Sequence, residues 1–291
     1  MRKRMSKQIL CLLLAALLTL ALTGCGKGGV KRDGDKLIVA VTIGPEKAFV
    51  EAVCGGLVEV ICLVPPGASA ETHEPTPAQM EELGRAAIYF AIGLPVEKAY
   101  VLSSIPADTK LVALQDEVAA IYAPRAFGAG DPDPHIWLSP KRVQVMIGVI
   151  AREMAALDPK NAANYAENAE AYHVKLDELD AHIKDALAGA QKKAFLVYHP
   201  AFGYFADDYG LTMVALEEEG KEATAQRLEE VVDFAKANGI KVIFYQEEMS
   251  LRQAAAFAEE IDGEAVMLSP LAENYIESLT AMADALAEAL K

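Results

Sequence analysis

Between residues 36 and 114, short runs of β-branched and other apolar residues alternate with segments whose apolar positions recur every three or four residues. A short continuous apolar run favours a buried strand, whereas the wider spacing favours a helix that buries one face. The pattern predicts strands at 36–42, 57–64, 87–92 and 110–114, with helices at 46–53, 76–86 and 96–104. Such alternation is typical of a parallel sheet with helices on both faces.

From residue 194 onward the chain repeats this alternation. Strands are predicted at 194–198, 211–216, 241–245 and 264–268, each followed by a helix. Gly239 is expected to end the helix that starts near Thr224, because glycine readily adopts the left-handed conformation that closes helices. The last helix is predicted at 274–290.

The longest regular period in the sequence lies between these two regions. After a helix predicted at 140–157, apolar residues recur at intervals of three or four: Tyr165, Ala169, Tyr172, Leu176, Leu179, Ile183 and Leu187. They draw one apolar stripe along a helix, which at 1.5 Å per residue would be about 40 Å long. His173 and His182 lie beside the stripe and are expected to face solvent without a functional role.

The predicted fold class is α/β, with two lobes that each contain a four-stranded, mostly parallel sheet flanked by helices. One long helix joins the lobes. The expected boundaries are 36–158 for the N-terminal lobe, 159–190 for the linking helix and 191–291 for the C-terminal lobe.

The first 24 residues are typical of an export signal. Four basic residues precede an apolar run at 9–22, which is too short to cross a bilayer as a stable helix. Residues 25–35 are rich in glycine and lysine and are expected to form a flexible tether. The formal net charge is −15, and loss of the signal would make the chain about four units more negative. This charge argues against nucleic acid as a partner.

The sequence has four cysteines, but two lie at the N-terminus. Cys11 falls in the expected signal, and Cys25 follows it directly. Outside the cytoplasm Cys54 and Cys62 could form a disulfide, yet both also suit an apolar core as free thiols. The unpaired state is favoured, and both alternatives stay open.

His135 is the most constrained histidine in the chain. Pro134 fixes its own φ angle and keeps the preceding residue extended, so His135 begins on a stiffened segment. Trp137, the only tryptophan, is expected to anchor that segment by burial, and Ser139 is expected to cap a helix that starts at Pro140. Spacing alone permits either a hydrogen-bonded turn residue or a metal ligand.

Asp133-Pro-His-Ile-Trp-Leu-Ser-Pro140 resembles the DPHxWLDP motif of the substrate-binding lipoproteins of zinc and manganese ABC transporters. The resemblance extends through Pro66-Gly67, Glu74-Pro-Thr-Pro77, Asp158-Pro-Lys-Asn161 with Tyr165 and Asn168, and His199-Pro-Ala-Phe-Gly-Tyr-Phe205. It implies two lobes held nearly rigid by a long helix, with His135 as a metal ligand.

Leu22-Thr-Gly-Cys25 is similar to a bacterial lipobox. The similarity implies cleavage before Cys25, a diacylglyceryl thioether on its sulfur, and anchoring at the extracytoplasmic face of the cell membrane. The alternative is an ordinary signal peptide with an incidental cysteine.

Candidate ligands follow the ends of predicted strands. His199 follows the strand at 194–198, and Glu71 and His73 lie in the loop after 57–64. In open α/β sheets, ligands bind beyond the carboxyl ends of the strands. Neutral imidazole and carboxylate both bind Zn²⁺. With His135, these residues predict a Zn²⁺ site between the lobes, with Mn²⁺ as the alternative cargo.

Departures from the family pattern leave two ligands open. In the family's PHxYEP segment, Glu71 takes the place of the ligand histidine and His73 that of the aromatic residue. Because alternate residues of an extended segment point the same way, both could face the cleft, with Glu71 favoured by position. Ser269, a poor zinc ligand, stands where the family frequently has aspartate. Water or a carboxylate such as Glu247 would then complete the site.

The resemblance implies a monomeric binding protein that captures a divalent metal ion and delivers it to an ABC permease. A binding lipoprotein for a metal chelate, with a degenerate site, is the main alternative. A zinc-dependent hydrolase is a weaker one, because the sequence contains no HExxH motif, Gly-x-Ser-x-Gly motif or phosphate-binding glycine loop. A role in cell adhesion, ascribed to some members of the family, also stays open.

Overall fold

The computed structural model of the protein describes residues 32–33, 36–128, 130–217, 223–249 and 251–291. The expected signal peptide, Cys25 and most of the expected tether lie outside these residues. The tether prediction is wrong for Arg32–Asp33, which form strand β1 and pair antiparallel with the start of the next strand. Within the described ranges, no helix is both long enough and apolar enough to cross a membrane.

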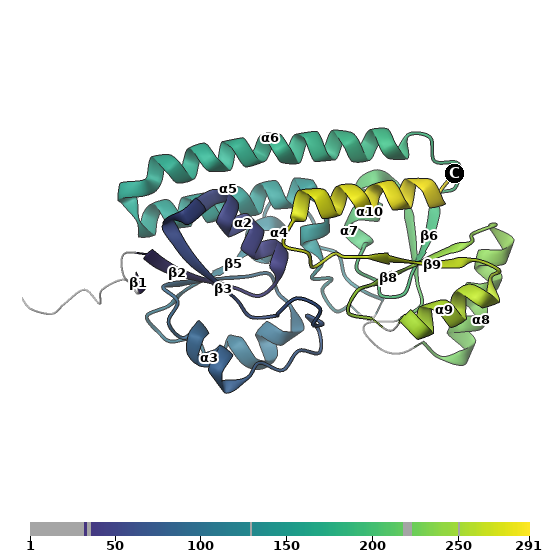
Figure 1. Cartoon of the computed structure of the whole chain (residues 1–291), viewed down its shortest axis with the longest axis horizontal. Helices are drawn as coiled ribbons and strands as arrows, with labels where there is room; N and C mark the ends of the chain where they lie inside the picture. Colours follow the sequence, from purple (N-terminus) through teal and green to yellow (C-terminus); the bar gives the residue numbers. More distant parts are fainter. Residues whose placement is uncertain (1–31, 34–35, 129, 218–222, 250) are drawn as a thin grey trace, which may run out of the picture. The chain divides into compact units, whose positions relative to one another are not determined.

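The first sheet lies in the N-terminal lobe (Figure 1). Its parallel strands are ordered β3-β2-β4-β5 and correspond to the four predicted strands. They span Lys36–Val41 (β2), Val58–Cys62 (β3), Ile88–Ala91 (β4) and Lys110–Ala113 (β5). β2 and β4 are buried almost throughout, as expected for central strands covered on both faces.

Short helices connect these strands. They are α2 (Gly44–Cys54), η2 (Gly55–Leu57), α3 (Pro77–Leu83), η3 (Glu97–Val101) and α4 (Leu114–Ala119). The helix predicted at 96–104 is replaced by η3, a short π-helix. The buried carboxylate of Glu97 accepts hydrogen bonds from the backbone N–H groups of Ile92, Gly93 and Leu94, so it fixes the loop that enters η3.

The second sheet lies in the C-terminal lobe and is entirely parallel, in the order β7-β6-β8-β9. Its strands span Ala194–Val197 (β6), Thr212–Ala215 (β7), Val242–Gln246 (β8) and Glu264–Leu268 (β9). Its helices are α7 (Gly203–Tyr209), α8 (Ala225–Ala237), α9 (Leu251–Glu260) and α10 (Tyr275–Ala289). Gly239 follows α8 with a φ of 62°, as predicted.

Both sheets therefore place their first strand between the second and the third. In this order the connections after the first and second strands leave in opposite directions, which opens a crevice at the carboxyl ends of the first and third strands. The crevice lies between β2 and β4 in one lobe and between β6 and β8 in the other.

The lobes are joined by α5 (Pro140–Leu157), η5 (Pro159–Asn161) and the 26-residue α6 (Ala162–Leu187). All seven residues of the predicted stripe are buried on α6. This face packs against α2 and α5 of the first lobe and α10 of the second, which lie alongside it in Figure 1. One continuous apolar core thus runs from the first sheet along α6 into the second lobe, and the predicted fold class is confirmed.

One local prediction needs correction. Ser139 stands at the N-cap of α5, but its hydroxyl donates to Asp208 and accepts from Arg142 instead of capping the helix. The buried ion pair between Arg142 and Asp208 therefore binds the hydroxyl that would otherwise cap the helix. Of the two alternatives left open for Cys54 and Cys62, the structure has the favoured one, in which both are free thiols.

Candidate metal centre

The segment that carries His135 is fixed by its neighbour Trp137. It runs into η4 (Ile136–Leu138), and only 2% of Trp137 is exposed. The indole N–H of Trp137 donates to the carbonyl of Pro270 at 2.9 Å, and its own carbonyl accepts from the hydroxyl of Tyr275 at 2.7 Å. Trp137 therefore ties this loop to the C-terminal lobe by hydrogen bonds as well as by burial.

The carboxylate of Asp133 orients the ring of His135. One oxygen, Oδ1, lies 2.8 Å from Nδ1 of His135 and also accepts the backbone N–H of His135 at 3.0 Å. The other oxygen accepts from Nε of Arg125 at 3.3 Å. With Nδ1 engaged by a carboxylate, the lone pair of the neutral ring is on Nε2, which is the arrangement that metal-binding histidines commonly show.

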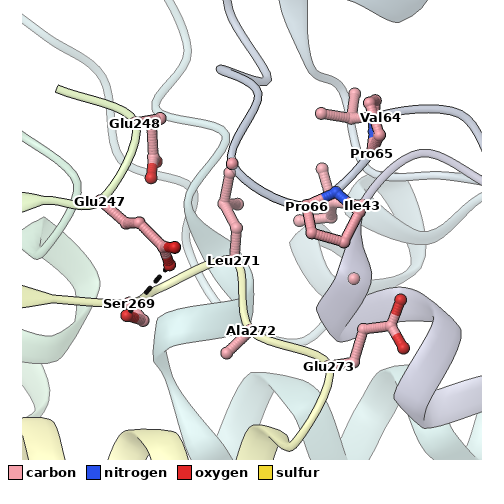
Figure 2. Close-up of a pocket in the computed structure, with 12 residues that line it drawn as sticks. Ile43, Val64, Pro65, Pro66, Glu247, Glu248, Ser269, Leu271, Ala272 and Glu273 are labelled. Carbon is pink, nitrogen blue, oxygen red and sulfur yellow. Dashed lines mark hydrogen bonds between the residues drawn. The ribbon is translucent and has the colours of Figure 1, made fainter.

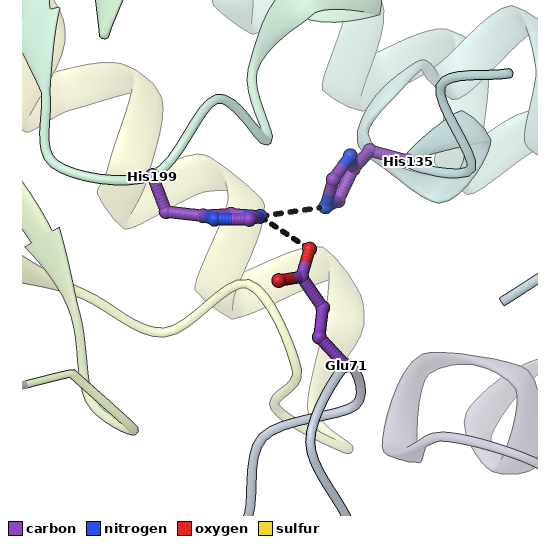
Figure 3. A group of neighbouring side chains, drawn as sticks. All are labelled: Glu71, His135 and His199. Atoms are coloured by element: carbon purple, nitrogen blue, oxygen red, sulfur yellow. Dashed lines mark hydrogen bonds and ion pairs between the residues drawn. The ribbon is translucent and has the colours of Figure 1, made fainter. Parts of the chain in front are cut away.

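His199 is held in the same manner from the other lobe. It follows β6 by two residues, is 3% exposed, and places Nδ1 at 2.9 Å from Oε2 of Glu217. Its Nε2 lies 3.3 Å from Nε2 of His135 and 2.8 Å from Oε1 of Glu71 (Figure 3). Burial lowers the pKa of His199, but the hydrogen bonds to Glu217 and Glu71 outweigh it and raise that pKa to about 9.

Glu71 reaches the two histidines from the loop after β3. Burial raises the pKa of Glu71, but its hydrogen bond to His199 and the charge of that ring leave the pKa below its ordinary value. Ligand atoms of Glu71, His135 and His199 all lie within 4.8 Å of one another. Ligands about 2.0–2.1 Å from a tetrahedral zinc are about 3.3 Å apart, so the two imidazole nitrogens already have a suitable separation.

His73 does not join this group. The premise that Glu71 and His73 lie on an extended segment is wrong, because the backbone N–H of His73 donates to the carbonyl of Ser69 and closes a turn. Alternate residues of a turn do not share a direction. Nε2 of His73 instead lies 3.5 Å from the amide nitrogen of Gln79.

The other two candidates, Ser269 and Glu247, lie in a neighbouring pocket (Figure 2). The hydroxyl of Ser269 is 3.5 Å from Oε2 of Glu247, and both side chains line a cavity together with Pro66 and Ala272. The three clustered side chains line an adjoining cavity of about 20 Å³. Glu248 lines both cavities, whereas Ser269 and Glu247 line only the first. Burial raises the pKa of Glu248 above its ordinary value, although the charge of His199 partly opposes this.

The remaining histidines have local roles. His182 is exposed and lies 2.8 Å from Asp284, as expected of a solvent-facing residue. His173 is only partly exposed, since its Nε2 lies 3.1 Å from the carbonyl of Gln144 on α5. The expectation that His173 simply faces solvent is therefore wrong, because α5 packs beside that edge of α6.

A family model, a known relative and a solved structure each match most of the chain. The family model described as zinc-uptake complex component A, periplasmic, matches residues 39–289. The high-affinity zinc uptake system protein ZnuA of Bacillus subtilis (strain 168) is 27% identical over 277 residues, covering 87% of this chain and 85% of that protein. A crystal structure of ZnuA aligns with a TM-score of 0.82 at 34% identity, covering 88% of this chain and 100% of that one.

The zinc-binding lipoprotein AdcA of Streptococcus pneumoniae (strain R6) is 30% identical over 284 residues. That match covers 92% of this chain and 55% of AdcA, so the chain spans about half the length of that protein.

Proposed function

Because the chain belongs to the family of periplasmic component A of zinc-uptake complexes, we propose that it captures a divalent metal ion outside the cytoplasm and delivers it to an ABC permease. The cargo is Zn²⁺, bound by Glu71, His135 and His199. The observation that carries this proposal is the approach of two imidazole nitrogens to 3.3 Å, each ring backed by a carboxylate on its other nitrogen.

The donor set supports zinc over manganese. Two imidazoles with carboxylate oxygen suit Zn²⁺, whereas Mn²⁺ favours sites richer in oxygen. The cavity of about 20 Å³ has room for one water-sized species, which supports a bare ion as cargo over a metal chelate.

The position of the ligands supports a simple mechanism of capture and release. His135 and Glu71 belong to the N-terminal lobe and His199 to the C-terminal lobe, so a bound cation links the two. The shared core along α6 limits how far the lobes move apart. Release then requires the permease to separate His199 from the other two ligands.

In this proposal the protein works as a monomer. It is anchored to the extracytoplasmic face of the membrane through a lipid on Cys25. The lipobox-like segment that ends at Cys25 supports this anchor. Expression of wild type and Cys25→Ser followed by membrane fractionation tests it. The variant should leave the membrane fraction, and equal retention of both proteins would rule out this anchor.

Metal titration tests the proposed cargo. The chelator-stripped protein should bind one Zn²⁺ per chain in competition with a chromogenic chelator. His135→Ala and His199→Ala should each weaken binding by at least the roughly 10- to 100-fold that loss of a supporting residue costs. His182→Ala, which removes an exposed imidazole from α6, is the matched control and should retain wild-type affinity. Unchanged affinity in both His135→Ala and His199→Ala would refute the proposed site.

A further inference from the structure

Three protein ligands leave a zinc ion one short of the four that it usually takes. Ser269 and Glu247 do not line the cavity that holds the cluster of Glu71, His135 and His199. A fourth protein donor must therefore come from the other side chains around that cavity.

The cavity narrows the choice of oxygen donors. Besides Glu71, the side chains with oxygen that line it are Ser69, Gln246 and Glu248. The hydroxyl oxygen of Ser69 already accepts the backbone N–H groups of Glu71 and Thr72, at 3.2 and 3.4 Å. Among the described lining residues, Glu248 is thus the remaining carboxylate.

The topology brings Glu248 to the same crevice as His199. Their strands β6 and β8 are parallel neighbours, with Val197 opposite Phe244 in the register. His199 is two residues beyond that pair on one strand, and Glu248 is four residues beyond it on the other. Both therefore leave the carboxyl ends of the first and third strands, where the crevice of this lobe opens.

Charge gives a reason for a second carboxylate. A Zn²⁺ ion with two neutral imidazoles and one carboxylate keeps a net charge of +1 on the ion and its direct ligands. The carboxylates of Asp133 and Glu217 act on that charge only through the imidazole rings. A second carboxylate bound directly to the ion would bring the ion and its ligands to neutrality.

From these observations, and resting on the proposed function, we propose that Glu248 is the fourth ligand of the captured zinc. The C-terminal lobe then contributes two of four ligands, His199 and Glu248, and the N-terminal lobe the other two. With two nitrogen and two oxygen donors, protein side chains fill all four coordination positions of the zinc ion. No position is left for water. Separation of the lobes in transport would remove half of the coordination at once.

The neighbour Glu247 offers a matched control for the test. It carries the same charge one residue away, but it pairs with Ser269 in the adjoining pocket, as the dashed line in Figure 2 marks. Glu248→Ala and Glu247→Ala therefore change net charge equally, and only the first removes a carboxylate from the residues that line the cavity of the cluster. Thermal unfolding of the metal-free proteins would verify that both variants are folded.

Two measurements on these variants decide the inference. Zn²⁺ affinity should fall at least about tenfold in Glu248→Ala and change less than about threefold in Glu247→Ala. In the Co²⁺-substituted protein, the visible d–d spectrum should change in Glu248→Ala, because water replaces a carboxylate, and stay unchanged in Glu247→Ala. Equal affinities and identical spectra in the two variants would overturn the role of Glu248 while leaving zinc capture intact. Failure of the wild type to bind Zn²⁺ would overturn both proposals.

Discussion

Substitution of Glu71 and His73 separates the two candidates for the first ligand. In the structure, Oε1 of Glu71 is 2.8 Å from Nε2 of His199, whereas His73 contacts the side chain of Gln79 and the carbonyl of Ser69. Glu71→Ala should therefore weaken zinc binding, and His73→Ala should leave it within about twofold of the wild type.

The size of the effect follows from the position of Glu71. Loss of a group that only supports a ligand typically costs about 10- to 100-fold in metal affinity. A direct ligand should cost at least the upper part of that range, and 100-fold corresponds to about 2.7 kcal/mol. Glu71 also supplies a carboxylate charge to the cation, which His73 does not.

A third variant adds a positive test. Glu71→His puts an imidazole where the carboxylate stands, and imidazole is itself a good zinc ligand. It should recover much of the affinity that Glu71→Ala loses. All four proteins would be titrated with Zn²⁺ in competition with a chelator of known affinity. A loss of binding in His73→Ala together with wild-type binding in Glu71→Ala would refute the assignment of Glu71.

Further predictions concern the supporting carboxylates and a buried acid. Asp133→Asn and Glu217→Gln should each weaken zinc binding about 10- to 100-fold, since each carboxylate orients one ligand ring; unchanged titration curves would contradict this. Burial and the charge of Glu97 hold the pKa of Glu46 well above its ordinary value. The folded state thus binds this proton more tightly than the unfolded state, and stability is lost as pH rises above the unfolded value of about 4.3. Denaturant unfolding at pH 5 and 8 should show Glu46→Gln gaining stability relative to wild type at the higher pH; an equal difference at both values would contradict it.

Much of the fold could be predicted because its elements have strong local patterns. The apolar stripe on α6 is buried along its length, and apolar runs mark the eight parallel strands, including β5 and β9, whose residues are partly exposed. Local patterns are weaker where one side chain decides the backbone. The π-helix at Glu97–Val101 follows a loop that is fixed by the carboxylate of Glu97, and no periodicity signals that contact. The short pairing of Arg32–Asp33 with β2 likewise has no apolar signature.

The site was predictable in part. Strand ends and a stiff proline segment indicate His135 and His199, whereas the choice of Glu71 over His73 depends on a turn that closes at Ser69. Glu217 and Glu248 are not among the residues predicted from the sequence. Each lies two residues beyond a strand, Glu217 after β7 and Glu248 after β8, as His199 does after β6, so the same strand-end argument could have found them. The hydrogen bond between His199 and Glu217 joins residues 18 positions apart, so local sequence patterns do not reveal it.

The central claim is that one cation is shared by two imidazoles from opposite lobes. Crystals of the zinc-loaded protein, measured at the zinc absorption edge, test it most directly. The account predicts one anomalous peak about 2.0–2.1 Å from Nε2 of both His135 and His199. A peak at another place, or contact with only one of these two rings, would contradict it.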